Sequence, residues 1–317
     1  MNKNLEKNSL KFSDNNILQI MCGVYHGNLD LIEEILNVSL IPKGNIISIK
    51  GKPENIVLTK NTLSKLYERA KDSNIIEKGD VEAVINFMKE EKNSNNKNKV
   101  YKNYFIKTPK ASIYPRSNEQ INLIKNLSEK NLVFAIGPAG TGKTFLAVSY
   151  AVSLLLSGSV DKIIISRPAV EAGEKLGFLP GDLKQKIDPY LRPIYDSLHE
   201  NLPSNQVLKF IEEEKIEIAP IAYMRGRTLN NSYIILDEAQ NTSAVQMKMF
   251  LTRLGNNSKM VITGDLSQID LPDKKSSGLL DAEKNLKKIK EIAFIHLSEK
   301  DVVRNPLVSK IIKAYKT

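Results

Sequence analysis

Apolar residues in the second part of the chain gather in six short, nearly unbroken runs, and stretches with helical spacing separate several of them. A strand buried on both faces reads as a continuous apolar run, and strands that alternate with helices form parallel sheets. The pattern therefore predicts an α/β domain in which helices cover both faces of a parallel sheet. The expected strands are residues 132–136, 162–166, 216–219, 233–236, 260–263 and 293–297, and the clearest helices are residues 145–156 and 243–254.

The first part of the chain has a different order of elements. Residues 28–36 repeat apolar side chains at helical spacing, and a Pro-Lys-Gly turn separates two short runs of strand character. The pattern predicts a small α+β domain with helices at 28–36, 54–70 and 78–89 and strands at 38–41 and 45–50.

This helix–strand–strand–helix order resembles a KH-type RNA-binding module. Such a module clamps a nucleic-acid backbone through a Gly-x-x-Gly loop before its helix. The corresponding loop here, residues 23–27, reads Gly-Val-Tyr-His-Gly and is one residue longer. A helical docking or oligomerisation domain is the alternative interpretation of this region.

A basic segment separates the two parts. Residues 92–110 contain six lysines, five asparagines and no acidic residue, and their first half lacks apolar periodicity. A solvated linker has this composition, although lysines interleaved with Tyr101, Tyr104 and Phe105 also suit contact with a nucleic-acid strand. We favour the linker, and expect an N-terminal domain at 1–91, a basic linker at 92–112 and an α/β domain at 113–317.

The composition narrows the classes of protein. The 317 residues are 41% hydrophobic and 26% charged, as in ordinary globular proteins. No run approaches the roughly 18 apolar residues of a membrane helix, and the polar N-terminus has no signal-peptide core. A single cysteine, Cys22, excludes an intramolecular disulfide, and three histidines leave little for a metal cluster. We expect a cytoplasmic protein, and the net charge of +10 permits a polyanionic partner.

The loop after the first expected strand of the α/β domain reads GPAGTGKT, which fits the Walker A pattern G-x-x-x-x-G-K-[ST]. Its glycines let backbone N–H groups turn towards phosphate oxygens, and the N-terminus of the following helix favours an anion. Lys143 is expected to reach the β- and γ-phosphates, and the Thr144 hydroxyl to bind Mg²⁺. The predicted ATP-binding residues are Gly137, Pro138, Ala139, Gly140, Thr141, Gly142, Lys143 and Thr144.

An acidic pair follows another expected strand. Residues 233–241 read YIILDEAQN, which is the Walker B pattern of an apolar strand ending in Asp-Glu. Asp237 is expected to hold Mg²⁺, directly or through water. Glu238 is expected to orient and deprotonate the attacking water, which predicts a hydrolase.

Two further polar motifs accompany the Walker pair. Residues 263–268 read TGDLSQ after a strand, and Gln268 is expected to sense the γ-phosphate. Residues 114–120 read YPRSNEQ, and the amide of Gln120 offers a donor and an acceptor for adenine; a polar helix N-terminus is the alternative. Both motifs resemble those of the first motor domain of superfamily 1 helicases, which implies a RecA-like P-loop NTPase fold.

Longer segments resemble the PhoH family of bacterial P-loop ATPases. They are residues 166–198, SRPAVEAGEKLGFLPGDLKQKIDPYLRPIYDSL; residues 222–242, AYMRGRTLNNSYIILDEAQNT; and residues 301–312, DVVRNPLVSKII. The resemblance covers essentially residues 100–317. It implies a cytoplasmic ATP-binding protein linked to RNA metabolism or phosphate starvation.

Superfamily 1 helicases complete their ATP site with an arginine from a second motor domain, and the chain after Gln268 is too short for one of about 100 residues. The arginine then acts within the subunit or comes from a neighbouring one, which favours a homo-oligomeric ring such as a hexamer. Arg304 is the first candidate, before Arg225 and Arg227. Arg167 is expected to contact nucleic acid or Glu238.

The combined interpretation is an oligomeric, helicase-like ATPase that uses ATP and Mg²⁺ and acts on RNA or another single-stranded nucleic acid. The alternative is an ATP-dependent regulatory or assembly factor that acts on a protein partner. An RNA-binding module with vestigial ATP binding is disfavoured, because Glu238 is intact.

Overall fold

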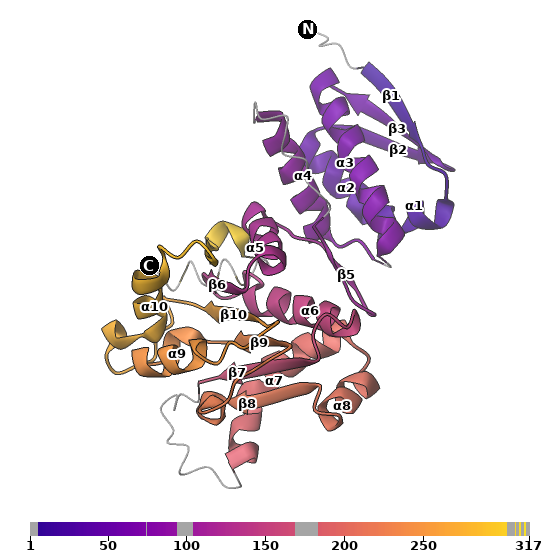
Figure 1. Cartoon of the computed structure of the whole chain (residues 1–317). Helices are drawn as coiled ribbons and strands as arrows, with labels where there is room; N and C mark the ends of the chain where they lie inside the picture. Colours follow the sequence, from indigo (N-terminus) through magenta and orange to yellow (C-terminus); the bar gives the residue numbers. More distant parts are fainter. Residues whose placement is uncertain are drawn as a thin grey trace. The chain divides into compact units, whose positions relative to one another are not determined.

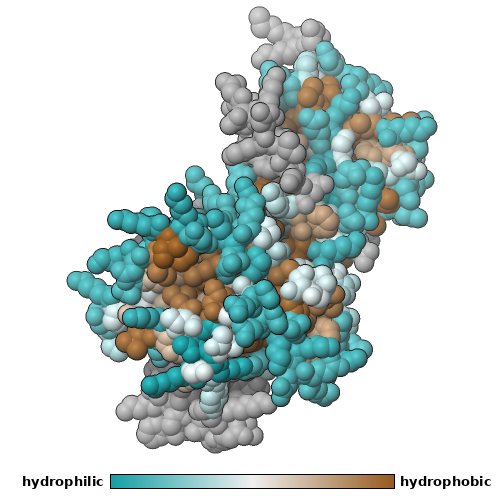
Figure 2. Space-filling model, viewed as in Figure 1, coloured by the Kyte–Doolittle hydropathy of each residue, from teal (hydrophilic) through white to brown (hydrophobic). Residues whose placement is uncertain are grey.

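The computed structural model describes residues 6–73, 75–93, 104–168 and 183–302, together with 308, 311 and 314. The chain forms two compact units (Figure 1). The smaller comprises residues 1–104 and 114–118, and the larger residues 105–113 and 119–317. In the described ranges no helix is long and apolar enough to cross a membrane, and hydrophilic residues cover much of the visible surface (Figure 2).

The larger unit is built on a parallel six-stranded sheet, which confirms the predicted fold class. Each strand starts within one residue of the start of an expected apolar run. The spatial order of the strands is β11-β6-β10-β9-β7-β8. The strands are β6 (Leu132–Ile136), β7 (Lys162–Arg167), β8 (Ile216–Pro220), β9 (Ser232–Leu236), β10 (Lys259–Gly264) and β11 (Ile292–His296).

Helices cover this sheet on both faces. Every residue of β6 and β9 is buried, so neither face of these strands is left to solvent. On one face α9 and α10 lie side by side and pack Phe250 and Leu279 against the strands (Figure 1). The helices are α5 (Asn118–Glu129), α6 (Lys143–Leu156), α7 (Leu183–Asn201), α8 (Ser204–Glu212), α9 (Ala244–Leu251) and α10 (Gly278–Leu286), with 3-10 turns η3 (Ile221–Met224), η4 (Ala239–Asn241), η5 (Lys274–Ser276) and η6 (Glu299–Asp301).

The smaller unit packs helices on an antiparallel sheet of order β1-β3-β2. Burial alternates along β3, where Ile47 and Ile49 enter the core and their neighbours face outwards. The elements are β1 (Glu6–Lys11), α1 (Asn15–Cys22), η1 (Val24–His26), α2 (Gly27–Leu36), β2 (Ser39–Lys43), β3 (Ile46–Gly51), α3 (Pro53–Asp72) and α4 (Lys78–Asn93).

The segment expected as a linker contains structure in its second half. The short strands β4 (Ile106–Lys107) and β5 (Ser112–Ile113) form an antiparallel pair within the larger unit. Residues 114–118 pack with the smaller unit, where the Arg116 guanidinium lies 2.7 Å from Glu77 and 3.3 Å from Asp80. Residues 94–103, which contain three of the six lysines of the basic segment, lie outside the described residues.

Candidate nucleotide-binding site

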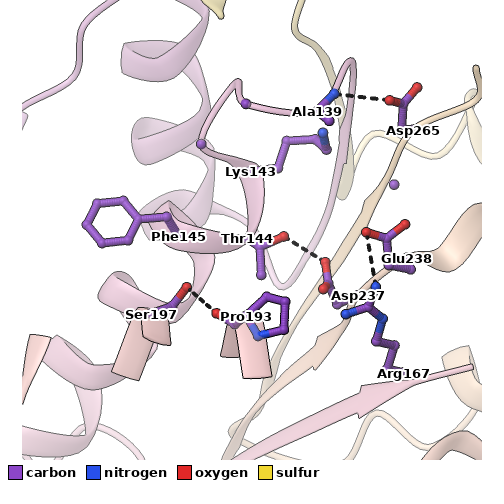
Figure 3. A pocket seen from close by; sticks show the side chains of 13 residues that line it. Ala139, Lys143, Thr144, Phe145, Arg167, Pro193, Ser197, Asp237, Glu238 and Asp265 are labelled. Atoms are coloured by element: carbon purple, nitrogen blue, oxygen red, sulfur yellow. Dashed lines mark hydrogen bonds and ion pairs between the residues drawn. The ribbon is translucent and has the colours of Figure 1, made fainter. Parts of the chain in front are cut away.

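A pocket of about 290 Å³ opens at the carboxyl edge of the parallel sheet, where β6, β9, β10 and β7 end (Figure 3). Ligand sites in open α/β sheets lie at this edge. The pocket brings together residues from four segments of the sequence and from α7. Its lining residues are Ala139, Gly140, Gly142, Lys143, Thr144, Phe145, Arg167, Pro193, Ser197, Asp237, Glu238, Gly264 and Asp265.

The predicted phosphate-binding loop connects β6 to α6. Gly140 and Gly142 have φ values of 85° and 80°, in the left-handed region that suits glycine. Helix α6 begins directly afterwards at Lys143, so its first N–H groups are directed towards the pocket mouth. This backbone geometry is suited to cradling phosphate oxygens.

Lys143 lies over its own loop. Its Nζ donates hydrogen bonds of 2.6 Å to the Gly137 carbonyl and 2.8 Å to the Pro138 carbonyl, and the side chain is buried. The ammonium group is therefore held at the mouth of the loop, where it can exchange carbonyl oxygens for those of a phosphate.

Asp237 receives two hydroxyl hydrogen bonds on one carboxylate oxygen. The Thr144 Oγ1 donates to its Oδ1 at 2.7 Å and the Thr263 Oγ1 at 2.6 Å. A hydroxyl and a carboxylate are hard oxygen donors of the kind that Mg²⁺ prefers. The residues present therefore fit a Mg²⁺ ion held by Thr144 and, directly or through water, by Asp237.

Glu238 directs a carboxylate into the same pocket from an unusual backbone conformation. Its φ of 53° and ψ of 37° lie in the left-handed region, which costs a non-glycine residue about 1–3 kcal/mol. Its Oε2 accepts a hydrogen bond of 2.5 Å from the Gln240 amide, and its Oε1 lies 3.5 Å from Arg167 Nη2. Both oxygens of the predicted general base are thus engaged within the protein.

The motif at residues 263–268 contributes Asp265 to the pocket. Its carboxylate accepts a hydrogen bond of 3.0 Å from the Ala139 N–H of the phosphate-binding loop. The Gln240 Oε1 accepts the Asp265 N–H at 3.0 Å, and the Gln240 amide donates to the Gln268 carbonyl at 3.2 Å. Both residues stand in the motifs quoted from the sequence, but the sequence predicted no role for either of them.

Gln268 itself is exposed and is absent from the described lining of the pocket. Gln120 is buried, and its amide donates a hydrogen bond of 3.0 Å to the Thr141 carbonyl of the phosphate-binding loop. Sensing of the γ-phosphate by Gln268 and recognition of adenine by Gln120 stay predictions.

Arginines predicted from the sequence have different positions. Arg167 lines the pocket, whereas Arg225 and Arg227 are not among its described lining residues. Arg227 forms a fork with Glu217 at 2.5 and 2.8 Å, and this hydrogen bonding holds the pKa of Glu217 below its ordinary value. Arg304 lies outside the described residues.

The parallel sheet order, the phosphate-binding loop between β6 and α6 and the acidic pair after β9 define the fold of a P-loop nucleoside triphosphatase. The chain belongs to the PhoH family: residues 112–316 match the PhoH-like protein family. This match confirms the resemblance found in the sequence.

Named relatives agree with this assignment. A PhoH-like protein of Bacillus subtilis is 49% identical over 288 residues, covering 90% of both chains. A PhoH-like protein of Synechocystis is 42% identical, covering 93% of this chain and 90% of that protein. Protein PhoH of Escherichia coli is 44% identical over 207 residues, covering 65% of this chain and 58% of that protein.

Solved structures show looser likeness. The large terminase of bacteriophage D6E is 12% identical with a TM-score of 0.39, covering 62% of this chain and 49% of that one. The Pif1 helicase of Candida albicans is 14% identical with a TM-score of 0.34, covering 62% of this chain and 42% of that one.

Proposed function

We propose that this protein binds ATP with Mg²⁺ and hydrolyses it. The observation that carries the proposal is the meeting of Lys143, Thr144, Asp237 and Glu238 in one pocket. These side chains supply a phosphate-binding cation, two oxygen donors for the metal and a carboxylate for the attacking water.

In this mechanism the loop N–H groups and Lys143 bind the triphosphate. Thr144 and Asp237 would hold Mg²⁺, which would supply positive charge to the phosphates. Glu238 orients a water molecule and takes its proton.

We further propose that the ATPase is helicase-like and acts on RNA. The support is the net charge of +10 and the loop between α1 and α2, where Val24 is 82% and Tyr25 96% exposed. An aromatic ring held in solvent between Gly23 and Gly27 suits base stacking beside a close backbone contact. A KH-like role for the smaller unit rests on this loop.

A specific observation also favours the alternative, in which the partner is a protein. A groove of about 560 Å³ beside the same loop is lined largely by apolar groups, including Ile20, Val24, Ile75 and Ile76. Ile75 is 73% exposed. Exposed apolar surface of this kind also suits contact with another polypeptide.

Homo-oligomerisation into a ring and a cytoplasmic location remain part of the proposal. The arginine charge of the site comes either from the same chain or from a neighbouring subunit, for which Arg304 is the candidate. Light scattering of the purified protein tests the assembly.

ATP turnover by the full chain, with and without single-stranded RNA, tests the function. We expect Mg²⁺-dependent turnover that RNA stimulates. Turnover that RNA does not change would favour the protein-partner alternative, and absence of turnover under both conditions would refute the ATPase.

A further inference from the structure

Arg167 ends strand β7 and turns its guanidinium into the nucleotide pocket beside Glu238 (Figure 3). It is the only arginine among the described residues that line this pocket. Its Nη2 lies 3.5 Å from Glu238 Oε1, and the two side chains are 20% and 34% exposed. The site therefore contains, within one chain, a cation next to the predicted general base.

The attacking water must share the Glu238 carboxylate with two protein groups. Gln240 donates to Oε2 and Arg167 lies 3.5 Å from Oε1, so each oxygen keeps lone-pair capacity for a water but already has a protein contact. A partly exposed ion pair at 3.5 Å is weak. A γ-phosphate carries more negative charge than a carboxylate and offers several acceptor oxygens to the planar fork of an arginine.

We propose that Arg167 is a catalytic residue that exchanges Glu238 for the γ-phosphate when ATP binds, and so supplies the arginine charge of the site from within the same chain. The exchange removes the cation from Glu238 Oε1 and leaves that oxygen to the attacking water. The water oxygen then bonds to the γ-phosphorus, the bond from that phosphorus to the β,γ-bridging oxygen breaks with its electron pair going to ADP, and the water proton passes to Glu238. The proposal rests on the ATPase function.

The affinities for an ATP analogue and for ADP together distinguish a γ-phosphate contact of Arg167 from a structural role. We expect Arg167→Ala to bind a non-hydrolysable ATP analogue about ten- to hundredfold more weakly, the range for losing a hydrogen bond to a charged group. Affinity for ADP is expected to change less than twofold. Calorimetry with Mg²⁺ and each nucleotide measures both values, and does so even if the protein proves not to hydrolyse ATP.

Lys162→Ala is the matched control, because Lys162 begins the same strand and forms an ion pair with Glu214 away from the pocket. It should leave both affinities unchanged. Arg167→Lys keeps the charge without the fork and should lie between wild type and Arg167→Ala. Equal losses for ADP and the analogue, or no loss for either, would overturn the proposal.

Turnover tests whether the arginine acts in its own chain. Arg167→Ala should lower kcat about 10²-fold or more, as for other groups that stabilise transition-state charge. Mixing Arg167→Ala with Glu238→Gln chains should restore nothing, because no chain then carries both residues. Restored turnover would assign Arg167 to a neighbour's site and overturn the assignment. Wild-type protein without turnover refutes the ATPase, and leaves the binding measurement to decide the contact.

Discussion

The Thr144 hydroxyl donates a hydrogen bond of 2.7 Å to the Asp237 carboxylate, joining two motifs that lie 93 residues apart in the sequence. The Thr263 hydroxyl donates to the same oxygen from β10, the strand between β6 and β9. Asp237 is buried among these donors. Hydrogen bonds within the protein therefore hold together the oxygen groups that suit Mg²⁺.

This alignment predicts the effect of Asp237→Asn. The amide oxygen can still accept both hydroxyl hydrogen bonds, so the fold should survive, but the negative charge that attracts Mg²⁺ is lost. We expect the Mg²⁺ concentration for half-maximal turnover to rise about tenfold or more, in line with losing one charged contact. A magnesium titration of ATP turnover measures it. An unchanged titration curve would remove Asp237 from the metal site.

Lys143→Ala addresses nucleotide binding. A methyl group cannot offset the charge of the triphosphate, and it also releases the Gly137 and Pro138 carbonyls that Nζ now holds. We expect binding of an ATP analogue to fall below detection in calorimetry, with an unchanged circular dichroism spectrum. Wild-type affinity in this variant would contradict the assignment of the phosphate-binding loop.

The sequence was sufficient for the parts of the fold that depend on local pattern. Strand β9 is buried along its whole length and therefore shows as an apolar run. Strand β1 has the sequence EKNSLK with Leu10 as its one apolar residue and is mostly exposed, so periodicity did not reveal it. Its place in the sheet comes from pairing with β3, a contact between distant segments.

The residues of the candidate site were likewise predictable where a local sequence motif contains them. Local motifs gave Lys143, Thr144 and the acidic pair, because their spacing carries the chemistry. Asp265 and Gln240 enter through hydrogen bonds between neighbouring strand ends, and no spacing rule within one segment encodes such contacts. For the same reason the motif did not reveal that the backbone carbonyl of Gln268 accepts a hydrogen bond from Gln240.

The Glu238→Gln variant tests ATP hydrolysis while leaving ATP binding in place. The amide keeps the shape of the side chain but cannot take a proton from water, so turnover should fall about 10²-fold or more while ATP affinity is retained. Single-turnover assays with excess enzyme measure the step directly. Glu217→Gln, which alters an acid paired with Arg227, is the control and should hydrolyse normally. A Glu238→Gln variant with the parent rate would show that another group acts as the base.

The last prediction concerns the loop of the smaller unit. Tyr25 is 96% exposed and has a φ of 51°, so its ring is held in solvent by a left-handed turn between Gly23 and Gly27. If a base of RNA stacks on it, Tyr25→Ala should weaken binding of single-stranded RNA by about 1–3 kcal/mol. Tyr223→Ala is the control, since Tyr223 is 56% exposed but lies in the larger unit.

Fluorescence anisotropy with a labelled oligonucleotide, repeated across salt concentrations, measures the affinities of both variants for RNA. Phosphate contacts should give a salt slope that both variants share, because neither substitution removes a charge. Equal RNA affinity for Tyr25→Ala and Tyr223→Ala would place the RNA-binding surface elsewhere.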